Sequence, residues 1–230
     1  MNFFIPHQRA ARTAPVNAGV RPTIAFNGDP MTMTNKTRRI LTGILGGLAI
    51  FIVANYYAGS RLIDHSKEWE RDCKEAADSL AGNPSPYDRF SILTKAEIPT
   101  FECGKRELAK SYAIEVLAKA PDFQRYWNYG NAIHKSHIVL GRYYLAKGDV
   151  DSACQELLLA GRTPGSPQLD SFGPNMSLAR ELLTMGRRET VLQYFDECKV
   201  FWRSDFGALT KWRIMIRLHL MPDFGANLLF

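Results

Sequence analysis

Two stretches of the chain decide its fold: LGRYYLAKGDVDSACQELLLA at residues 140–160 and LARELLTMGRRETVLQYFDEC at residues 178–198. They align without a gap at an offset of 38 residues, the difference between 178 and 140. An internal repeat of this length indicates a protein that stacks copies of one supersecondary unit. The positions that match in size or type are Leu140/Leu178, Gly141/Ala179, Tyr144/Leu182, Gly148/Gly186, Ala153/Val191, Leu157/Phe195 and Ala160/Cys198.

The matched positions predict helical hairpins. The small residues of the set allow the two helices of a hairpin to approach closely, and the large residues Leu157 and Phe195 fill the groove between hairpins. Gly148 and Gly186 permit the tight turn within each hairpin, because glycine adopts positive φ without a steric penalty. We therefore expect these repeat-packing positions to lie in the core.

The pattern resembles the tetratricopeptide repeat family, whose landmarks are L-G-x2-Y, a turn glycine, A-x3-F and a closing alanine. The first segment departs from it by placing His137 at the usual tryptophan position and by moving the closing proline to Pro164 or Pro167. The second segment has Ala179 where the family pattern has glycine, and Val191 where it has alanine. Since the usual period is about 34 residues, the loop 162–175 is interpreted as an insertion that could contact a ligand. The likeness to bacterial proteins of this type implies no reaction.

The rest of the chain after residue 60 also reads as helical, because apolar residues recur at spacings of three and four with no strand-like alternation. The fold class predicted is therefore all-α: one N-terminal transmembrane helix followed by a hairpin-repeat domain. The expected helices are 61–81, 105–120, 123–147, 149–161, 175–185, 188–203 and 207–220. The expected organisation is a disordered basic tail (1–39), a transmembrane helix (40–60), a membrane-proximal helix with an irregular connector (61–104), the repeat domain (105–222) and a C-terminal tail (223–230).

The stretch ILTGILGGLAIFIVANYYAGS, residues 40–60, contains no charged residue. As a helix it would be roughly 31 Å long, enough to cross the hydrocarbon core of a bilayer. Lys36, Arg38 and Arg39 precede it, so the positive-inside rule predicts a cytoplasmic N-terminus. In a bacterium this places a single-pass protein in the inner membrane with residues 61–230 in the periplasm. A cleaved signal peptide remains an alternative, and the true start could be Met31 or Met33.

Net charge argues against a nucleic-acid-binding module. The chain carries a formal charge of +6, from 29 basic and 23 acidic residues. Six of those basic residues and one acid fall in 1–39, so 61–230 is almost neutral. Binding to phosphate backbones requires clustered positive charge, which this part of the sequence does not provide.

The sequence contains four cysteines, all on the predicted extracytoplasmic side: Cys73, Cys103, Cys154 and Cys198. An even number in an oxidising compartment permits disulfides, although three pairings exist. The pair Cys73 and Cys103 would join the membrane-proximal helix to the start of the next one. Cys154 and Cys198 could form a second disulfide. Alternatively, both remain free and pack in the repeat core as small apolar residues.

No motif for catalysis, for phosphate binding or for a cofactor is present, so no catalytic residue, metal or cofactor is predicted. His134 and His137 are three residues apart on one helix face, but metal binding needs further ligands, and core packing is the simpler interpretation. Trp127 and Tyr129 follow a helix start and could anchor a partner, whereas the other aromatic residues are expected to pack in the core.

The function expected from the sequence is binding of another protein or peptide; the alternative is a small envelope enzyme or metal-binding protein without a recognisable motif. The family resemblance assigns the concave face to the helices containing 134–147 and 175–185. The residues that this places on the face are Lys135, Ile138, Arg142, Leu145, Arg180 and Leu183. Paired guanidinium groups match carboxylates, so an acidic segment or a C-terminal carboxylate is the expected ligand. Alternatively, the arginines are solvated or bridge to Glu181 and Glu156.

Overall fold

Gly148 and Gly186 form the turns of two antiparallel helix pairs in the computed structural model, which describes residues 65–229. Their φ angles are +83° and +77°, and a β-carbon at either position would meet no neighbouring atom. Backbone conformation, not lack of space, therefore favours glycine at both turns. The two pairs are α5 (Tyr129–Ala146) with α6 (Val150–Gly161), and α8 (Ser177–Thr184) with α9 (Arg188–Phe201).

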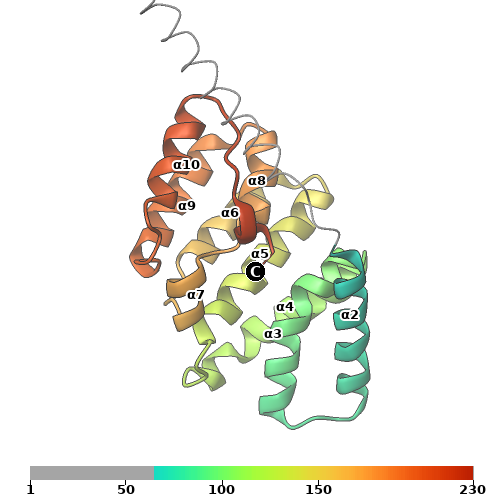
Figure 1. Cartoon of the computed structure of the whole chain (residues 1–230). Coiled ribbons are helices and arrows are strands. Elements are labelled where there is room, and N and C mark those ends of the chain that lie inside the picture. The colour runs from blue at the N-terminus through green and yellow to red at the C-terminus, as the bar shows by residue number, and fades with distance from the viewer. Residues whose placement is uncertain (1–64, 230) are drawn as a thin grey trace, which may run out of the picture. The chain divides into compact units, whose positions relative to one another are not determined.

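The described residues, 65–229, all lie within one compact unit. Within 65–229 every regular element is helical, which confirms the all-α class. From α2 to α6 each helix packs on the next in sequence, and α6 then packs on α8 and α9. The helices α2 to α4 lie at one end of the described part and α9 and α10 at the other (Figure 1). The further elements are α2 (Ser66–Ala81), α3 (Pro86–Glu102), α4 (Arg106–Lys119), the 3-10 helix η1 (Ala120–Phe123), α7 (Pro167–Phe172), α10 (Ala208–Arg217) and the 3-10 helix η2 (Gly225–Leu228).

The structure differs most from the sequence-based expectation over 83–104, which we expected to be largely irregular but which forms α3 and pairs with α4. Ser85 caps the helix by accepting a hydrogen bond from the Asp88 amide, and Pro86 stands in the first turn, where a missing N–H costs nothing. The prolines therefore start the helix and do not prevent it. Pro99 lies inside α3, where packing of the buried stripe outweighs its lost hydrogen bond.

Most of the matched repeat positions lie in the core of the two hairpins. Nine are completely buried: Ala153, Leu157, Ala160, Leu178, Ala179, Leu182, Val191, Phe195 and Cys198. Leu140 is also buried, and Tyr144 is half-buried against the core. At Gly141 an added β-carbon would lie 2.2 Å from Cδ2 of Leu178, so this small residue lets α5 approach α8 of the next pair. The described residues thus form packed helix pairs that are compatible with a helical-repeat fold.

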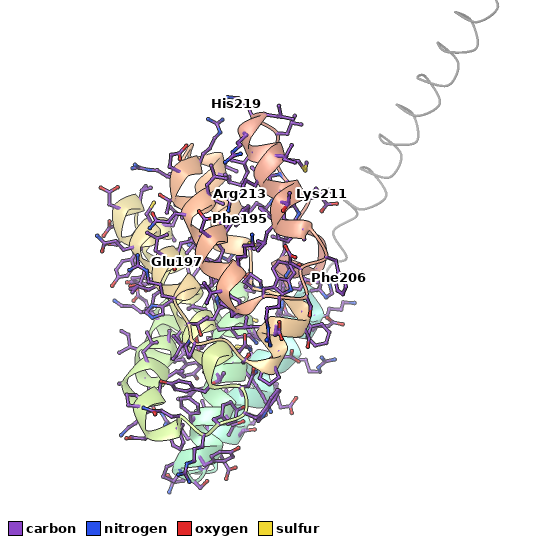
Figure 2. The ribbon with its side chains drawn as sticks, turned by 90° about the vertical axis from the view of Figure 1, so that its left-hand side faces the viewer. Phe195, Glu197, Phe206, Lys211, Arg213 and His219 are labelled. Carbon is purple, nitrogen blue, oxygen red and sulfur yellow. The ribbon has the colours of Figure 1, made fainter. Side chains whose placement is uncertain are left out.

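The segment after α10 folds back and closes this end of the unit. Phe224 is 2% exposed and packs against Trp212 and Phe195, the latter visible on α9 in Figure 2. Trp212 donates its indole N–H to the Asp223 carbonyl at 3.0 Å. Further along, the Met176 amide donates to the carbonyl of Asn227 at 2.7 Å. Residues 223–229 are therefore part of the folded structure and not a free tail.

Among residues 65–229, no helix combines the length and the apolar character that crossing a membrane requires. The transmembrane helix predicted at 40–60 and the basic tail predicted at 1–39 lie outside the described residues.

Candidate functional site

Arg142, the central residue of the predicted binding face, is engaged within the protein. Its Nε donates to Glu181 at 2.8 Å, its Nη1 pairs with Glu102, and its guanidinium lies 4.6 Å from the centroid of the Phe101 ring. Its side chain is 13% exposed. Arg142 therefore joins α3, α5 and α8 and has little capacity left for an external carboxylate. Of the two acids considered from the sequence, Glu181 is a partner, whereas Glu156 bonds to His137 instead.

The other residues of the predicted face do not form one exposed surface. Ile138 is 1% exposed and Leu183 is 9% exposed, so both belong to the core. Leu145 is half-buried against that core. Arg180 is exposed, and Lys135 lies between exposed and buried on α5. Arg142 forms ion pairs, whereas no described acidic side chain lies within ion-pair distance of Lys135 or Arg180.

A buried carboxyl group lies beside Lys135 and was not considered from the sequence. Glu97 of α3 is 0% exposed and accepts a hydrogen bond from the Ser136 hydroxyl at 3.0 Å, while its Oε2 atom has no hydrogen-bond partner among the described residues. Burial raises the pKa of Glu97 to about 8, so the carboxyl is mostly protonated at neutral pH. Burial also lowers the pKa of Lys135, an effect that the charge of Glu97 opposes. Such shifted groups occur at functional sites and in structural networks alike.

His134 is a structural brace. Its Nδ1 donates to the Ala160 carbonyl at 3.0 Å, and its Nε2 accepts from the Asn175 amide at 2.9 Å. Burial lowers the pKa of His134 to about 4, so the ring is neutral with both nitrogens occupied. Metal binding would break one of these bonds, and no group of three or more potential ligands is found among residues 65–229.

A recess lies where the α2–α3 turn meets the end of α4. Its volume is about 280 Å³, and its lining includes Pro84 and Pro86 near the start of α3. The 3-10 turn η1 adds Phe123 to the lining, because Pro121 ends the α-helical pattern of α4. A shallower recess continues past Phe123 toward Tyr87 and Tyr126. We call this continuous surface the aromatic pocket, lined by Pro84, Pro86, Tyr87, Arg89, Phe90, Leu93, Glu115, Lys119, Pro121, Asp122, Phe123, Gln124, Arg125 and Tyr126.

Aromatic rings pack closely in the walls of this pocket. Phe90 and Phe123 stack with centroids 4.5 Å apart, and Tyr87 meets the Tyr126 ring edge-on at 5.8 Å. Tyr87 remains 51% exposed, and the neighbouring Trp127 is 62% exposed. The pocket thus combines the buried ring of Phe90 with the exposed ring of Tyr87, and the exposed ring of Trp127 lies beside the ring of Tyr126, with centroids 6.2 Å apart.

A paired charge forms another wall of the pocket. Arg89 makes a two-point contact with Glu115, at 2.5 Å from Nε and 2.8 Å from Nη2. The contact lowers the pKa of Glu115, which stays ionised at neutral pH. Because each charge satisfies the other, the pair holds α3 against α4 and leaves apolar contact as the main attraction that the pocket offers.

The sequence had pointed to Trp127 as a possible anchor but not to Tyr87, Phe90 or Phe123. Tyr87 and Phe90 fell in the stretch expected to be irregular. The signal that could have found them is Ser85-Pro86 followed by Asp88, a combination typical of helix N-termini. No family model, curated protein or solved structure matches the chain. The structure by itself defines an all-α protein of packed helix pairs.

Proposed function

We propose that this chain is a membrane-anchored helical-repeat protein that binds another protein, with the described domain on the extracytoplasmic side. The uncharged stretch 40–60 supplies the anchor, and the basic residues before it favour a cytoplasmic N-terminus. In a bacterium the domain would face the periplasm. The packed helix pairs and the tetratricopeptide-like pattern at 140–198 support an interaction module and not an enzyme.

The observation that carries the proposal is the aromatic pocket, with exposed Tyr87 in its lining and exposed Trp127 beside the lining residue Tyr126. A recess of about 280 Å³ can receive one or two apolar side chains of a partner. Aromatic residues that are half-exposed in the free protein dominate many interfaces, because they bury a large area on binding and lose little conformational freedom. We therefore expect the partner to insert an apolar or aromatic residue into the recess that Phe90 and Phe123 line.

The test uses the full chain in detergent and a photo-crosslinking amino acid. Placed at Trp127, it should yield a defined adduct identified by mass spectrometry, and the same label at Phe206 should not. Phe206 is a matched control because it is an aromatic residue, 96% exposed, at the start of α10 (Figure 2). The partner identified in this way is then measured by affinity capture without the crosslinker. It should be lost from the double variant Tyr87→Ala/Trp127→Ala and retained by Phe206→Ala.

Folding controls accompany the capture. Because Tyr87 and Trp127 are largely exposed, the double variant should keep the helical content of the wild type and most of its thermal stability. Undiminished capture by a folded double variant would refute the assignment of the binding site to the aromatic pocket. Equal labelling from Trp127 and Phe206 would refute specific binding.

A further inference from the structure

The last α-helix of the described part, α10, carries apolar side chains on two opposite faces. Leu209, Trp212 and Ile216 recur at helical spacing and are buried in the core. Ile214 and Leu218 fall on the other side of the helix, four residues apart, and are 52% and 64% exposed. The inner stripe is enough to dock α10 on the domain, so packing within the domain does not account for the outer one.

The chain just past α10 extends this outer apolar surface. Leu220 and Met221 are 55% and 36% exposed. The Leu220 amide donates to the Met215 carbonyl at 2.9 Å, and His219 has a φ of +60°, so the chain turns back at the end of the helix. Figure 2 shows His219 at this end of α10. The turn therefore places further apolar side chains beside the last turn of the helix.

Positive charge accompanies these apolar side chains. Lys211 and Arg217 are both exposed on α10, and no described carboxylate lies within ion-pair distance of either. Arg213, by contrast, pairs with Asp196 of α9 at 2.5 Å. The sequence contains no acidic residue over 206–222. The outer side of α10 thus keeps two cations that no acid on the same helix offsets.

The two acids that flank this range hold backbone amides. Asp205 accepts a hydrogen bond from the Gly207 amide at 3.2 Å, and Asp223 accepts one from the Gly225 amide at 3.1 Å. The outer side of α10 therefore joins exposed apolar groups to positive charge. We call it the α10 surface, made up of Lys211, Ile214, Arg217, Leu218, Leu220 and Met221.

We propose that the α10 surface docks on a lipid bilayer that contains anionic headgroups. The outer face of a terminal helix in a helical-repeat domain is normally polar, so the exposed leucine and isoleucine side chains of α10 indicate that another surface covers them. Apolar side chains of this kind insert at the boundary between headgroups and acyl chains, while lysine and arginine contact the anionic headgroups. A symmetric contact between two copies is disfavoured, because it would bring Lys211 and Arg217 against the same charges of the other copy.

The inference rests on the membrane anchor proposed above for residues 40–60. That anchor keeps the domain within reach of the bilayer, so docking is an intramolecular step and needs only weak attraction. It does not depend on the aromatic pocket. Figure 1 shows the α2–α3 turn, which borders that pocket, at the opposite end of the described part from the C-terminal end of α10. Docking through α10 therefore turns the pocket away from the bilayer, where a partner can reach it.

The test reconstitutes the full chain in lipid nanodiscs made of phosphatidylcholine alone or of a three-to-one mixture with phosphatidylglycerol. A fluorescent amino acid replaces Leu220, and the discs contain a lipid whose acyl chain carries a quencher. In the anionic discs, quenching at Leu220 should be at least about threefold stronger than at Tyr87. Tyr87 is the matched control position, because it is 51% exposed and lies next to the α2–α3 turn.

Double variants separate the apolar and the charged contributions while the probe stays at Leu220. Ile214→Ser/Leu218→Ser should reduce quenching to the level of the control position in both kinds of disc. Lys211→Gln/Arg217→Gln should remove the extra quenching that phosphatidylglycerol gives, whereas Lys211→Arg/Arg217→Lys should keep it. Because all four side chains are exposed, each variant should retain the helical content and the melting temperature of the parent protein.

The outcomes separate this proposal from the proposed function. Equal quenching at Leu220 and Tyr87, or quenching that Ile214→Ser/Leu218→Ser leaves unchanged, would overturn docking through the α10 surface. Quenching that is the same with and without phosphatidylglycerol would overturn the choice of an anionic bilayer. Self-association that Leu218→Ser abolishes, without quenching by lipid, would assign the surface to a second copy. A chain that does not stay with the discs would overturn both the anchor and this proposal, whereas loss of partner capture through Trp127 would affect only the proposed binding function.

Discussion

Replacing Glu97 by glutamine should stabilise the protein at neutral pH. The glutamine keeps the shape of the side chain and can accept the hydrogen bond from Ser136 through its amide oxygen. It also removes the free-energy cost of keeping an ionisable carboxyl group in a buried site that disfavours its charged form. In the wild type, Glu97 folds with a pKa of about 8, while in the unfolded chain it has its ordinary value of 4.5.

The magnitude and its pH dependence follow from these two values. Below pH 4.5 the carboxyl is protonated in both states, so it carries no penalty. Between pH 4.5 and 8 only the folded state binds the proton, and the free energy of unfolding therefore falls as pH rises. At 1.36 kcal/mol per pH unit, the loss by pH 7 is about 3 kcal/mol. Glu97→Gln should recover about that amount at pH 7 and nothing at pH 4.

Chemical denaturation of the full chain at pH 4, 5.5, 7 and 8 provides the assay. The difference in the free energy of unfolding between Glu97→Gln and the wild type should rise steadily over this series. Glu75→Gln is the matched control, because Glu75 is exposed on α2 and its replacement should change stability by less than about 0.5 kcal/mol at every pH. A Glu97→Gln protein that equals or falls below the wild type at pH 7, with the same pH slope, would refute this account of the buried carboxyl.

Three further outcomes are expected. Gly130→Ala should lower the free energy of unfolding by about 3 kcal/mol or more in thermal unfolding, because the new β-carbon would lie 1.8 Å from the carbonyl oxygen of Gly165. Gly148→Ala places its β-carbon near no other atom and should cost only about 1 kcal/mol, because of the positive φ at this position. His134 has a pKa of about 4 in the folded protein, so this residue alone should lower the free energy of unfolding by about 3 kcal/mol between pH 6.5 and 4, against the opposite effect of Glu97. In denaturant titrations the wild type should therefore lose about 3 kcal/mol relative to His134→Asn over this range. Leu157→Ala should cost about 2–5 kcal/mol because the side chain is completely buried, and an unchanged melting temperature would contradict its packing role.

Several contacts of the structure could not have been predicted from local sequence. Glu97 follows Phe90 and Leu93 at helical spacing and precedes Phe101, so it interrupts the apolar stripe of α3 at its centre. Together with Pro99, that interruption concealed a helix that tertiary packing stabilises. For Arg142 the sequence left open a ligand contact or a bridge to Glu181, because Glu102 and Glu181 are each about 40 residues away and only the stacking of α3, α5 and α8 brings them within reach.

The sequence by itself determined the all-α class and the turns at Gly148 and Gly186. Both follow from interactions between near neighbours, namely the helical spacing of apolar residues and the positive φ that glycine tolerates. The tertiary structure alone decided the aromatic pocket and the burial of Glu97. Each of these depends on which helices pack side by side, and that arrangement is selected by the burial of apolar surface over the whole domain, which no short segment encodes.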